Sequence, residues 1–243
     1  MAINEAYNVD CIEYMRSLPD GYFDIAVCDP PYGSGNDTKL GGAKGSAEYS
    51  TDTANWNRLK GGRREKYYSH PPQTDGGRSI RGTVQEILQA GTGNKPGGGV
   101  LQAPTWAVAP PQLFFDQLFR VSKDQIIWGG NYFSLPPTRC FLVWKKTNIA
   151  EGFSMAMCEY AWTSFKGNAK VFDYSSLRKG NSGKFHPTEK PQELYAWTYK
   201  LFVDKNQTVF DPMMGSQASR VVAYKMGIDY IGCEIDKYYF DKG

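Results

Sequence analysis

The chain has 243 residues, of which 41% are hydrophobic and 14% aromatic, and a formal net charge of +3. These values fit one folded domain and exclude a wholly disordered chain, and no apolar run approaches the about 20 residues that span a membrane. The five cysteines are scattered without a CxxC spacing beside only two histidines, which argues against disulfides and a structural metal site. Because the chain also starts without a secretory pattern, we expect a reduced, cytoplasmic protein.

Short apolar runs alternate with stretches of helical periodicity along most of the chain. The predicted strands are residues 6–9, 23–28, 125–128, 140–144, 157–162, 208–210 and 230–233. The predicted helices are residues 11–18, 112–119, 191–202 and 218–226. Seven strands with helices between them are typical of an α/β fold with a doubly wound, Rossmann-like sheet.

One segment interrupts this alternation. Residues 33–99 hold 15 of the chain's 26 glycines and show almost no periodicity, which predicts a mobile insertion. We therefore expect a single domain over residues 1–243 with a glycine-rich insertion at 36–104. Between residues 36 and 108, 10 Lys and Arg stand against 6 Asp and Glu, so the excess positive charge of the chain lies in this segment.

The tetrapeptide DPPY at residues 29–32 follows directly on a predicted strand. It therefore lies at the carboxyl edge of the sheet, where α/β folds bind their ligands. The prolines lack N–H donors and leave carbonyl acceptors facing the cleft. A carboxylate, a proline carbonyl and an aromatic ring together suit an exocyclic amine on a flat heterocycle, and an ordinary proline turn is the alternative. The candidate catalytic residues are Asp29, Pro30, Pro31 and Tyr32.

A second motif, FDPMMGSQ, covers residues 210–217, and Glu234 closes the next predicted strand. Strand, glycine turn, helix and a later acidic residue are the layout of a nucleoside-binding βαβ unit. The turn has one glycine and no basic residue before Arg220. This favours a nucleoside without phosphates, such as S-adenosylmethionine, over a dinucleotide; an ordinary strand, turn and helix is the alternative.

A third motif, HPTEKP, covers residues 186–191 and leads into a predicted helix. Thr188 and Lys190 near that helix N-terminus suit a carboxylate, which the hydroxyl and the positive charge would bind. The alternative is that Thr188 only caps the helix.

These motifs, together with GCEID at residues 232–236, resemble the β-class amino-methyltransferases of DNA. Such enzymes transfer a methyl group from S-adenosylmethionine to adenine N6 or cytosine N4. The resemblance covers residues 1–35 and 105–243, and the motifs occur in the same order. It implies a circularly permuted order of the Rossmann-like fold, whose first two strands would lie at the end of this chain and whose third would lie at its start.

The resemblance also implies the activity: a site-specific, restriction-modification type of DNA methyltransferase from a bacterium or phage, acting on double-stranded DNA with the target base flipped out. The leading Asp of DPPY favours adenine N6 over cytosine N4. A methyltransferase of RNA or protein and a non-catalytic DNA-binding relative are further alternatives, and both a homodimer and a monomer remain open. The residues that the resemblance assigns to the cofactor are Asp10, Cys11, Asp29, His186, Thr188, Lys190, Asp211, Met213, Gly215, Ser216, Glu234 and Ile235.

Two features depart from the family pattern. The family usually has a second glycine where this chain has Gln217, whose longer side chain would crowd the methionine part of the cofactor or replace a water. The large addition follows DPPY, and its basic cluster beside aromatic residues suits contact with DNA phosphates, with a solvated linker as the alternative. The candidate DNA-binding residues are Arg58, Lys60, Arg63, Arg64 and Lys66.

Overall fold

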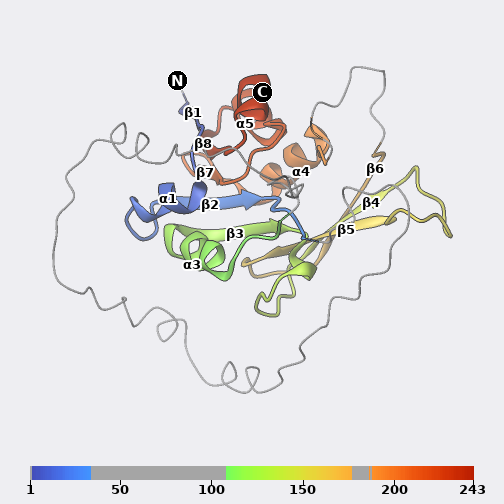
Figure 1. The fold of residues 1–243 in the computed structure, drawn as a ribbon. Helices are drawn as coiled ribbons and strands as arrows, with labels where there is room; N and C mark the ends of the chain where they lie inside the picture. The colour runs from blue at the N-terminus through green and yellow to red at the C-terminus, as the bar shows by residue number, and fades with distance from the viewer. Residues whose placement is uncertain (1, 34–107, 177–185, 187) are drawn as a thin grey trace, which may run out of the picture. The chain divides into compact units, whose positions relative to one another are not determined.

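The computed structural model describes residues 2–33, 108–176, 186 and 188–243. These residues form one sheet of eight strands in the order β1-β8-β7-β2-β3-β5-β4-β6, with helices on both faces (Figure 1). Every neighbouring pair is parallel except the two pairs that β5 makes with β3 and β4. The predicted α/β fold with a Rossmann-like sheet is therefore confirmed.

The strands are β1 (Asn4–Tyr7), β2 (Phe23–Cys28), β3 (Ser122–Trp128), β4 (Leu142–Lys146), β5 (Cys158–Thr163), β6 (Lys170–Tyr174), β7 (Thr208–Asp211) and β8 (Asp229–Cys233). The helices are α1 (Cys11–Arg16), α3 (Gln112–Val121), α4 (Gln192–Phe202), α5 (Ala218–Met226), α6 (Lys237–Lys242) and the short 3-10 helix η4 (Gly130–Tyr132). The sequence predicted seven strands, and β6 is the one it missed. This edge strand has mostly exposed or half-exposed side chains, so it lacks the apolar alternation that marks a half-buried strand.

The two ends of the chain meet inside the sheet. Strand β1 pairs in parallel with β8, with Ala6 opposite Gly232, and β8 pairs in turn with β7. Strand β7 then lies beside β2. The permuted order of strands that the motifs implied is thus the order in the sheet.

Strand β2 is apolar on both faces because helices cover both sides of the sheet. Ile25 and Val27 belong to the core that also contains side chains of α4 and α5. Ala26 and Cys28 belong to the core on the opposite face, with side chains of α1 and α3. Successive side chains of a strand point to opposite faces, so the burial of all four fixes β2 in the middle layer and leaves its carboxyl end for the site.

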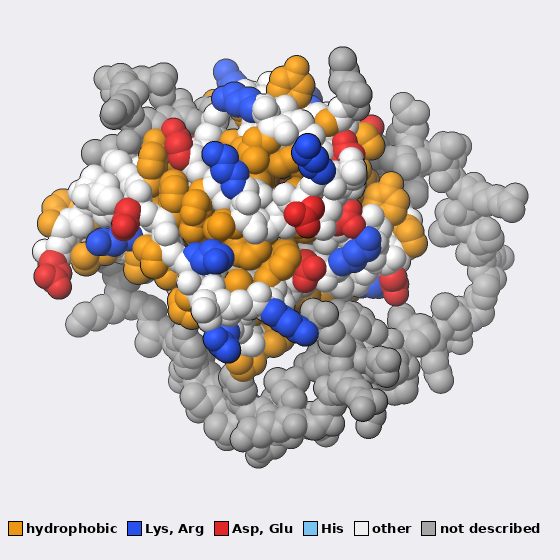
Figure 2. All heavy atoms as spheres, turned by 180° about the vertical axis from the view of Figure 1, so that it is seen from behind, with side chains coloured by type: hydrophobic (Ala, Val, Ile, Leu, Met, Phe, Trp, Pro, Cys, Tyr) orange, Lys and Arg blue, Asp and Glu red, His pale blue; other side chains and the backbone are white. Residues whose placement is uncertain are grey.

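The outer surface of the described residues is mixed in character. On the side away from the view of Figure 1, Lys, Arg, Asp and Glu side chains are scattered among apolar ones (Figure 2). Among the helices of the described residues, none has the length and apolar character needed to cross a membrane.

Candidate active site

A cavity of about 590 Å³ lies at the carboxyl edge of the sheet, within the range of roughly 300–1,000 Å³ that is usual for ligand sites. Its walls come from residues that follow β1, β2, β7 and β8, together with the end of β4 and the start of the antiparallel β5. Acidic residues outnumber basic ones among the described residues that line it, so the cavity favours a cationic ligand. The acidic residues are Asp10, Asp29, Glu159, Glu189, Glu234 and Asp236, and the basic ones are Lys146 and Lys190.

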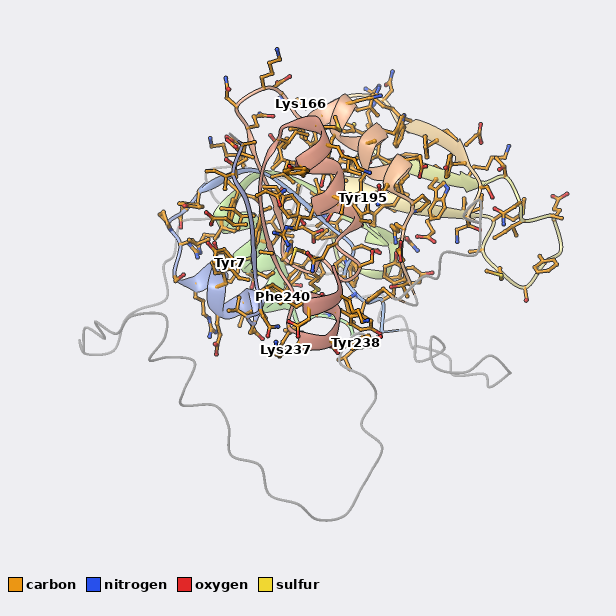
Figure 3. All side chains as sticks on the ribbon, turned by 90° about the horizontal axis from the view of Figure 1, so that it is seen from above. Tyr7, Lys166, Tyr195, Lys237, Tyr238 and Phe240 are labelled. Carbon is orange, nitrogen blue, oxygen red and sulfur yellow. The ribbon has the colours of Figure 1, made fainter. Side chains whose placement is uncertain are left out.

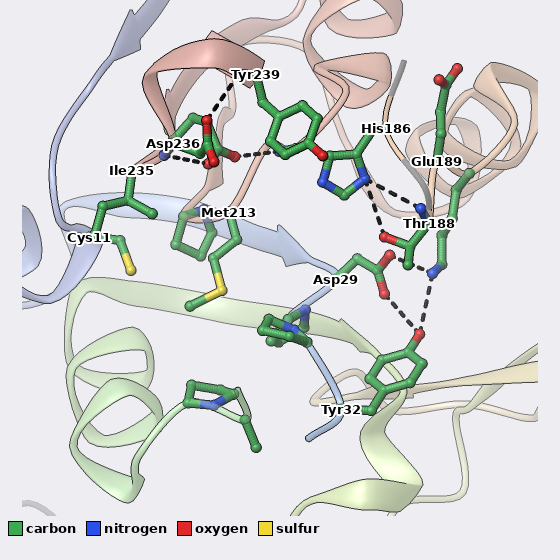
Figure 4. A pocket seen from close by; sticks show the side chains of 18 of the residues that line it. Cys11, Asp29, Tyr32, His186, Thr188, Glu189, Met213, Ile235, Asp236 and Tyr239 are labelled. Carbon is green, nitrogen blue, oxygen red and sulfur yellow. Dashed lines mark hydrogen bonds and ion pairs between the residues drawn. The ribbon is translucent and has the colours of Figure 1, made fainter. Parts of the chain in front are cut away.

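All four residues of DPPY line this cavity. The Tyr32 hydroxyl donates to Asp29 Oδ1 at 2.8 Å, and the Lys190 ammonium donates to Asp29 Oδ2 and, at 3.2 Å, to the Tyr32 oxygen (Figure 4). Burial raises the pKa of the Asp29 carboxyl, although the Lys190 ammonium acts in the opposite direction. Asp29 is therefore held in a fixed orientation from two sides.

The Tyr32 ring has its own support. The ring of Tyr132 packs parallel to it, with centroids 4.7 Å apart and an interplanar angle of 13°. Phe133 meets it edge-on at 6.4 Å. The aromatic surface beside Asp29 is thus built from three rings, of which Tyr132 and Phe133 come from η4 and the residue after it.

Glu159 and Lys146 extend the polar network beyond the predicted residues. Glu159 Oε2 lies 3.0 Å from the Lys190 ammonium, and Glu159 Oε1 lies 2.7 Å from the Lys146 ammonium. Burial alone would raise the pKa of Glu159, but the two ammonium groups lower it to about 2. The resemblance placed Glu159 in a target-side segment, residues 159–165, but sequence reasoning gave neither Glu159 nor Lys146 an individual role, because only the antiparallel pairing of β5 brings its first residues to this edge.

The other end of the cavity holds Glu234, just after β8. Its Oε2 accepts the Gly215 N–H at 2.7 Å and its Oε1 accepts the Asp236 N–H at 2.8 Å. Burial raises the pKa of the Glu234 carboxyl. Each oxygen keeps a further lone pair, so this fixed carboxylate can still accept hydrogen bonds from hydroxyl groups of a ligand.

Ten of the twelve residues assigned to the cofactor line the cavity. They are Asp10, Cys11, Asp29, His186, Thr188, Lys190, Met213, Gly215, Glu234 and Ile235. Asp211 and Ser216 are not among the described residues that line it. The ten residues come from both ends of the chain and from its middle, and the fold brings them to one edge of the sheet.

Asp211 has an internal role in the turn after β7. Its side chain is 1% exposed, its Oδ1 accepts the Met213 N–H at 3.1 Å and its Oδ2 accepts the Ser219 hydroxyl at 2.6 Å. Burial raises the pKa of this carboxyl to about 7. Asp211 thus fixes the loop that carries Met213 and Gly215 rather than facing the cavity.

His186 and Thr188 interact with each other. The Thr188 hydroxyl lies 3.2 Å from His186 Nδ1, and the His186 ring meets the Tyr239 ring edge-on at 4.4 Å. Helix α4 has Pro191 as its N-cap and no side-chain cap hydrogen bond. The alternative in which Thr188 caps that helix is therefore wrong.

Gln217 does not crowd the cavity. Its backbone is left-handed, with φ +57°, and its side chain is buried away from the cavity lining. The amide donates to the Phe240 carbonyl at 2.8 Å and accepts from Arg220 at 2.8 Å. Phe240 belongs to α6, close to Lys237 and Tyr238 (Figure 3). Gln217 therefore ties the glycine turn to the last helix.

The basic cluster predicted to bind DNA falls in residues 34–107, outside the described residues, and its role stays a prediction. Its members are Arg58, Lys60, Arg63, Arg64 and Lys66. Within the part of the chain that the structure describes, no group of three or more His, Cys, Asp or Glu is arranged to hold a metal ion.

Comparison with known proteins shows similarity to DNA methyltransferases. Residues 123–242 match the family model N6_N4_Mtase, described as DNA methylase. The type II methyltransferase M2.MboI of Moraxella bovis is 25% identical over 243 residues, covering 94% of this chain and 81% of that protein. The type II methyltransferase M.HinfI of Haemophilus influenzae is 23% identical over 272 residues, covering 98% of this chain and 67% of that protein.

A solved structure has the same fold. The PvuII DNA methyltransferase, a cytosine-N4-specific enzyme, aligns with a TM-score of 0.51 and 13% identity over 96% of this chain and 82% of that one. This likeness concerns the fold alone. The matched family model and the two relatives, in contrast, support an S-adenosylmethionine-dependent DNA amino-methyltransferase of the N6/N4 type.

Proposed function

We propose that this DNA methylase transfers a methyl group from S-adenosylmethionine to the N6 amine of adenine in double-stranded DNA. The observation that supports this most directly is the position of Asp29. Its carboxylate is oriented by Tyr32 and Lys190 at the carboxyl end of β2, inside a cavity in whose lining acidic residues outnumber basic ones. Pro30 follows it in the same wall and has a carbonyl acceptor but no N–H donor.

The residues at the Glu234 end of the cavity fit S-adenosylmethionine. When bound, this cofactor supplies a methyl group activated by a positively charged sulfur. Acidic walls suit that charge and disfavour a nucleotide with phosphates. Glu234 has lone pairs for ribose hydroxyls, and Asp10 and Cys11 line the same end beside Ile235.

At the other end of the cavity, Asp29 and the Pro30 carbonyl would each accept a hydrogen bond from one N–H of the exocyclic amine. The lone pair of this amine is delocalised into the ring, so it is a weak nucleophile. Two fixed acceptors would localise the lone pair and direct it at the methyl group, and most of the rate would come from this positioning and from polar stabilisation. No covalent bond between the chain and its substrate is needed.

The target amine lies inside a stacked duplex, so the base must leave the helix before it can reach Asp29. The Tyr32 ring, backed by Tyr132, offers an aromatic surface beside that carboxylate. An aromatic–base stack of this kind contributes about 1–3 kcal/mol. Tyr32→Ala should weaken the flipped-base complex by that amount without changing cofactor affinity.

Adenine N6 is favoured by the leading Asp of DPPY, because the cytosine-N4 group of the resembling class more often begins this motif with Ser. The alternative target is cytosine N4. Incubating the chain with S-adenosylmethionine and mixed-sequence duplex DNA, followed by mass spectrometry of the nucleosides, distinguishes the two. The proposal predicts N6-methyladenine, and N4-methylcytosine would favour the alternative.

A non-catalytic DNA-binding relative is the main functional alternative. It is disfavoured because the motif residues Asp29, Pro30 and Glu234 are all present in this chain and all line one cavity. Isothermal titration calorimetry with S-adenosylmethionine tests this point directly. A chain that bound DNA but gave no heat with the cofactor would support the non-catalytic alternative.

A further inference from the structure

The Lys190 ammonium is buried between two carboxylates. It donates to Asp29 Oδ2 and lies 3.0 Å from Glu159 Oε2, and its side chain is only 4% exposed. The rings of Tyr32 and Trp128 lie 5.7 and 5.9 Å from it, at cation–π distance. Although burial alone would lower it, Asp29 and then Glu159 hold the pKa of Lys190 well above its usual value. Lys190 is therefore a fixed positive charge.

The positive charge of Lys190 would slow the proposed reaction. Asp29 Oδ2 is engaged by Lys190 and Asp29 Oδ1 by Tyr32, while the same carboxylate is expected to accept a hydrogen of the amine. A buried ammonium with Asp29 as its only counter-ion would pair with this carboxylate more strongly. The carboxylate would then be a weaker hydrogen-bond acceptor for the amine. It would also oppose the positive charge that reaches the amine nitrogen.

Glu159 offsets this effect. It supplies a second negative charge to Lys190, and its side chain is only 22% exposed. Its other oxygen is held by Lys146, which is 11% exposed, so the carboxylate cannot rotate freely. Buried charges are tolerated when they are paired from several directions in this way.

We propose that Glu159 is a positioning residue for methyl transfer, which serves as the second counter-ion of Lys190 and thereby keeps Asp29 available to accept the amine. In this proposal Glu159 acts through Lys190, with which it pairs, and not directly on the cofactor or the amine. It lies at the β4–β5 end of the cavity, whereas Glu234 and Asp10 lie at the β8–β1 end. This inference rests on the proposed function, because it assumes that Asp29 receives the amine.

The test compares Glu159→Gln with the wild type in single-turnover methylation of duplex DNA. We expect the rate constant for transfer to fall about 10- to 100-fold, the size typical when a residue that orients another site residue is removed. The dissociation constant for S-adenosylmethionine should stay within about threefold, because Glu159 lies at the opposite end of the cavity from Glu234. Glu159→Asp keeps the charge and should recover most of the rate.

The matched control is Lys145→Gln. Lys145 is the neighbour of Lys146 on β4, its side chain is 60% exposed, and its nearest carboxylate is Asp173 at 3.8 Å. This variant removes one charge from the same strand without touching the buried network. It should methylate DNA at the wild-type rate, and its melting temperature should match the wild type.

A double-mutant cycle with Lys190→Met separates a role through Lys190 from direct action on the substrate. If Glu159 serves only as the counter-ion, adding Glu159→Gln to Lys190→Met should change the single-turnover rate by less than about twofold. This double variant no longer contains the Lys190 ammonium that Glu159→Gln alone would leave with a single counter-ion, so it keeps the test available if Glu159→Gln alone does not fold. Additive losses in the cycle would overturn the proposal, and so would a Glu159→Gln variant with the wild-type rate. A wild-type chain that does not methylate DNA would instead contradict the proposed function itself.

Discussion

The ring of Tyr32 lies directly against the backbone of Gly129. A Cβ atom at position 129 would stand 2.0 Å from Tyr32 Cε1, and Gly129 has a left-handed φ of +68°. Both the close approach and the backbone conformation therefore require glycine at this position. Because Gly129 directly follows β3, the end of that strand sets where the aromatic ring of DPPY can lie.

Gly129→Ala should displace Tyr32 and abolish most methyl transfer, while cofactor binding changes little. The matched control is Gly152→Ala, which also has a left-handed φ, of +86°, but has nothing within 4 Å of the added Cβ. In both variants a residue with a Cβ adopts a left-handed backbone, which destabilises the fold by about 1–2 kcal/mol. Their melting temperatures should therefore fall by similar amounts from this effect. A Gly129→Ala enzyme as active as Gly152→Ala would show that the position of Tyr32 does not matter for transfer.

Gln217 should matter for stability and not for cofactor affinity. Gln217→Ala removes the hydrogen bonds to Phe240 and Arg220 and should lower the free energy of unfolding by about 1–3 kcal/mol. Gln217→Gly should be about 1 kcal/mol more stable than Gln217→Ala, because glycine adopts the left-handed backbone without strain. Chemical denaturation measures both. Tighter binding of S-adenosylmethionine by either variant would show that the side chain reaches the cofactor after all.

Asp211 should make the fold less stable as the pH rises toward neutrality. Its pKa is raised from 3.8 to about 7 in the folded chain, so its contribution to stability is fully present below pH 4 and is lost as the pH passes through 7. That difference in pKa corresponds to roughly 4 kcal/mol. Asp211→Asn should therefore gain stability relative to the wild type between pH 4 and 7, as urea unfolding at several pH values would measure. A constant difference between the two proteins over that range would contradict the prediction.

The sequence was most informative where a pattern is local. The motifs DPPY and HPTEKP and the acidic residue Glu234 were identified from residue order alone, and the cavity lining brings them together. The ends of the strands in the structure differ from the predicted ends by a few residues, because pairing with neighbouring strands, and not local preference, decides where a strand stops.

What the sequence could not predict depends on contacts between distant segments. The contact between Glu159 and Lys146 depends on the antiparallel pairing of β5 with β4, so the local resemblance of residues 159–165 to a target-side segment could not reveal it. Asp211 belongs to a cofactor motif, yet it faces Ser219 of α5 in the interior. Gln217 looked like an obstacle to the cofactor because its partner Phe240 lies in a helix beyond the motif.

The basic cluster of the insertion should contribute to DNA affinity through phosphate contacts. Neutralising Arg63 and Arg64 together should flatten the dependence of the logarithm of the binding constant on the logarithm of salt concentration, by up to about two phosphate equivalents. Affinity for S-adenosylmethionine should stay the same. Fluorescence anisotropy with a labelled duplex over a range of salt concentrations measures the slope. An unchanged slope would mean that these two arginines do not contact phosphates.

The central claim is that Asp29 receives an adenine amine for methylation, and a comparison of the wild type with Asp29→Asn tests it most directly. The asparagine keeps the shape of the side chain but removes the charge that pairs with Lys190. Both proteins would be incubated with duplex DNA and S-adenosylmethionine carrying a labelled methyl group, and the nucleosides would be separated by mass spectrometry. We expect labelled N6-methyladenine from the wild type and a loss of at least about 100-fold in Asp29→Asn, with cofactor affinity retained within a few-fold by calorimetry. Label in cytosine, or undiminished N6-methyladenine from Asp29→Asn, would contradict the claim.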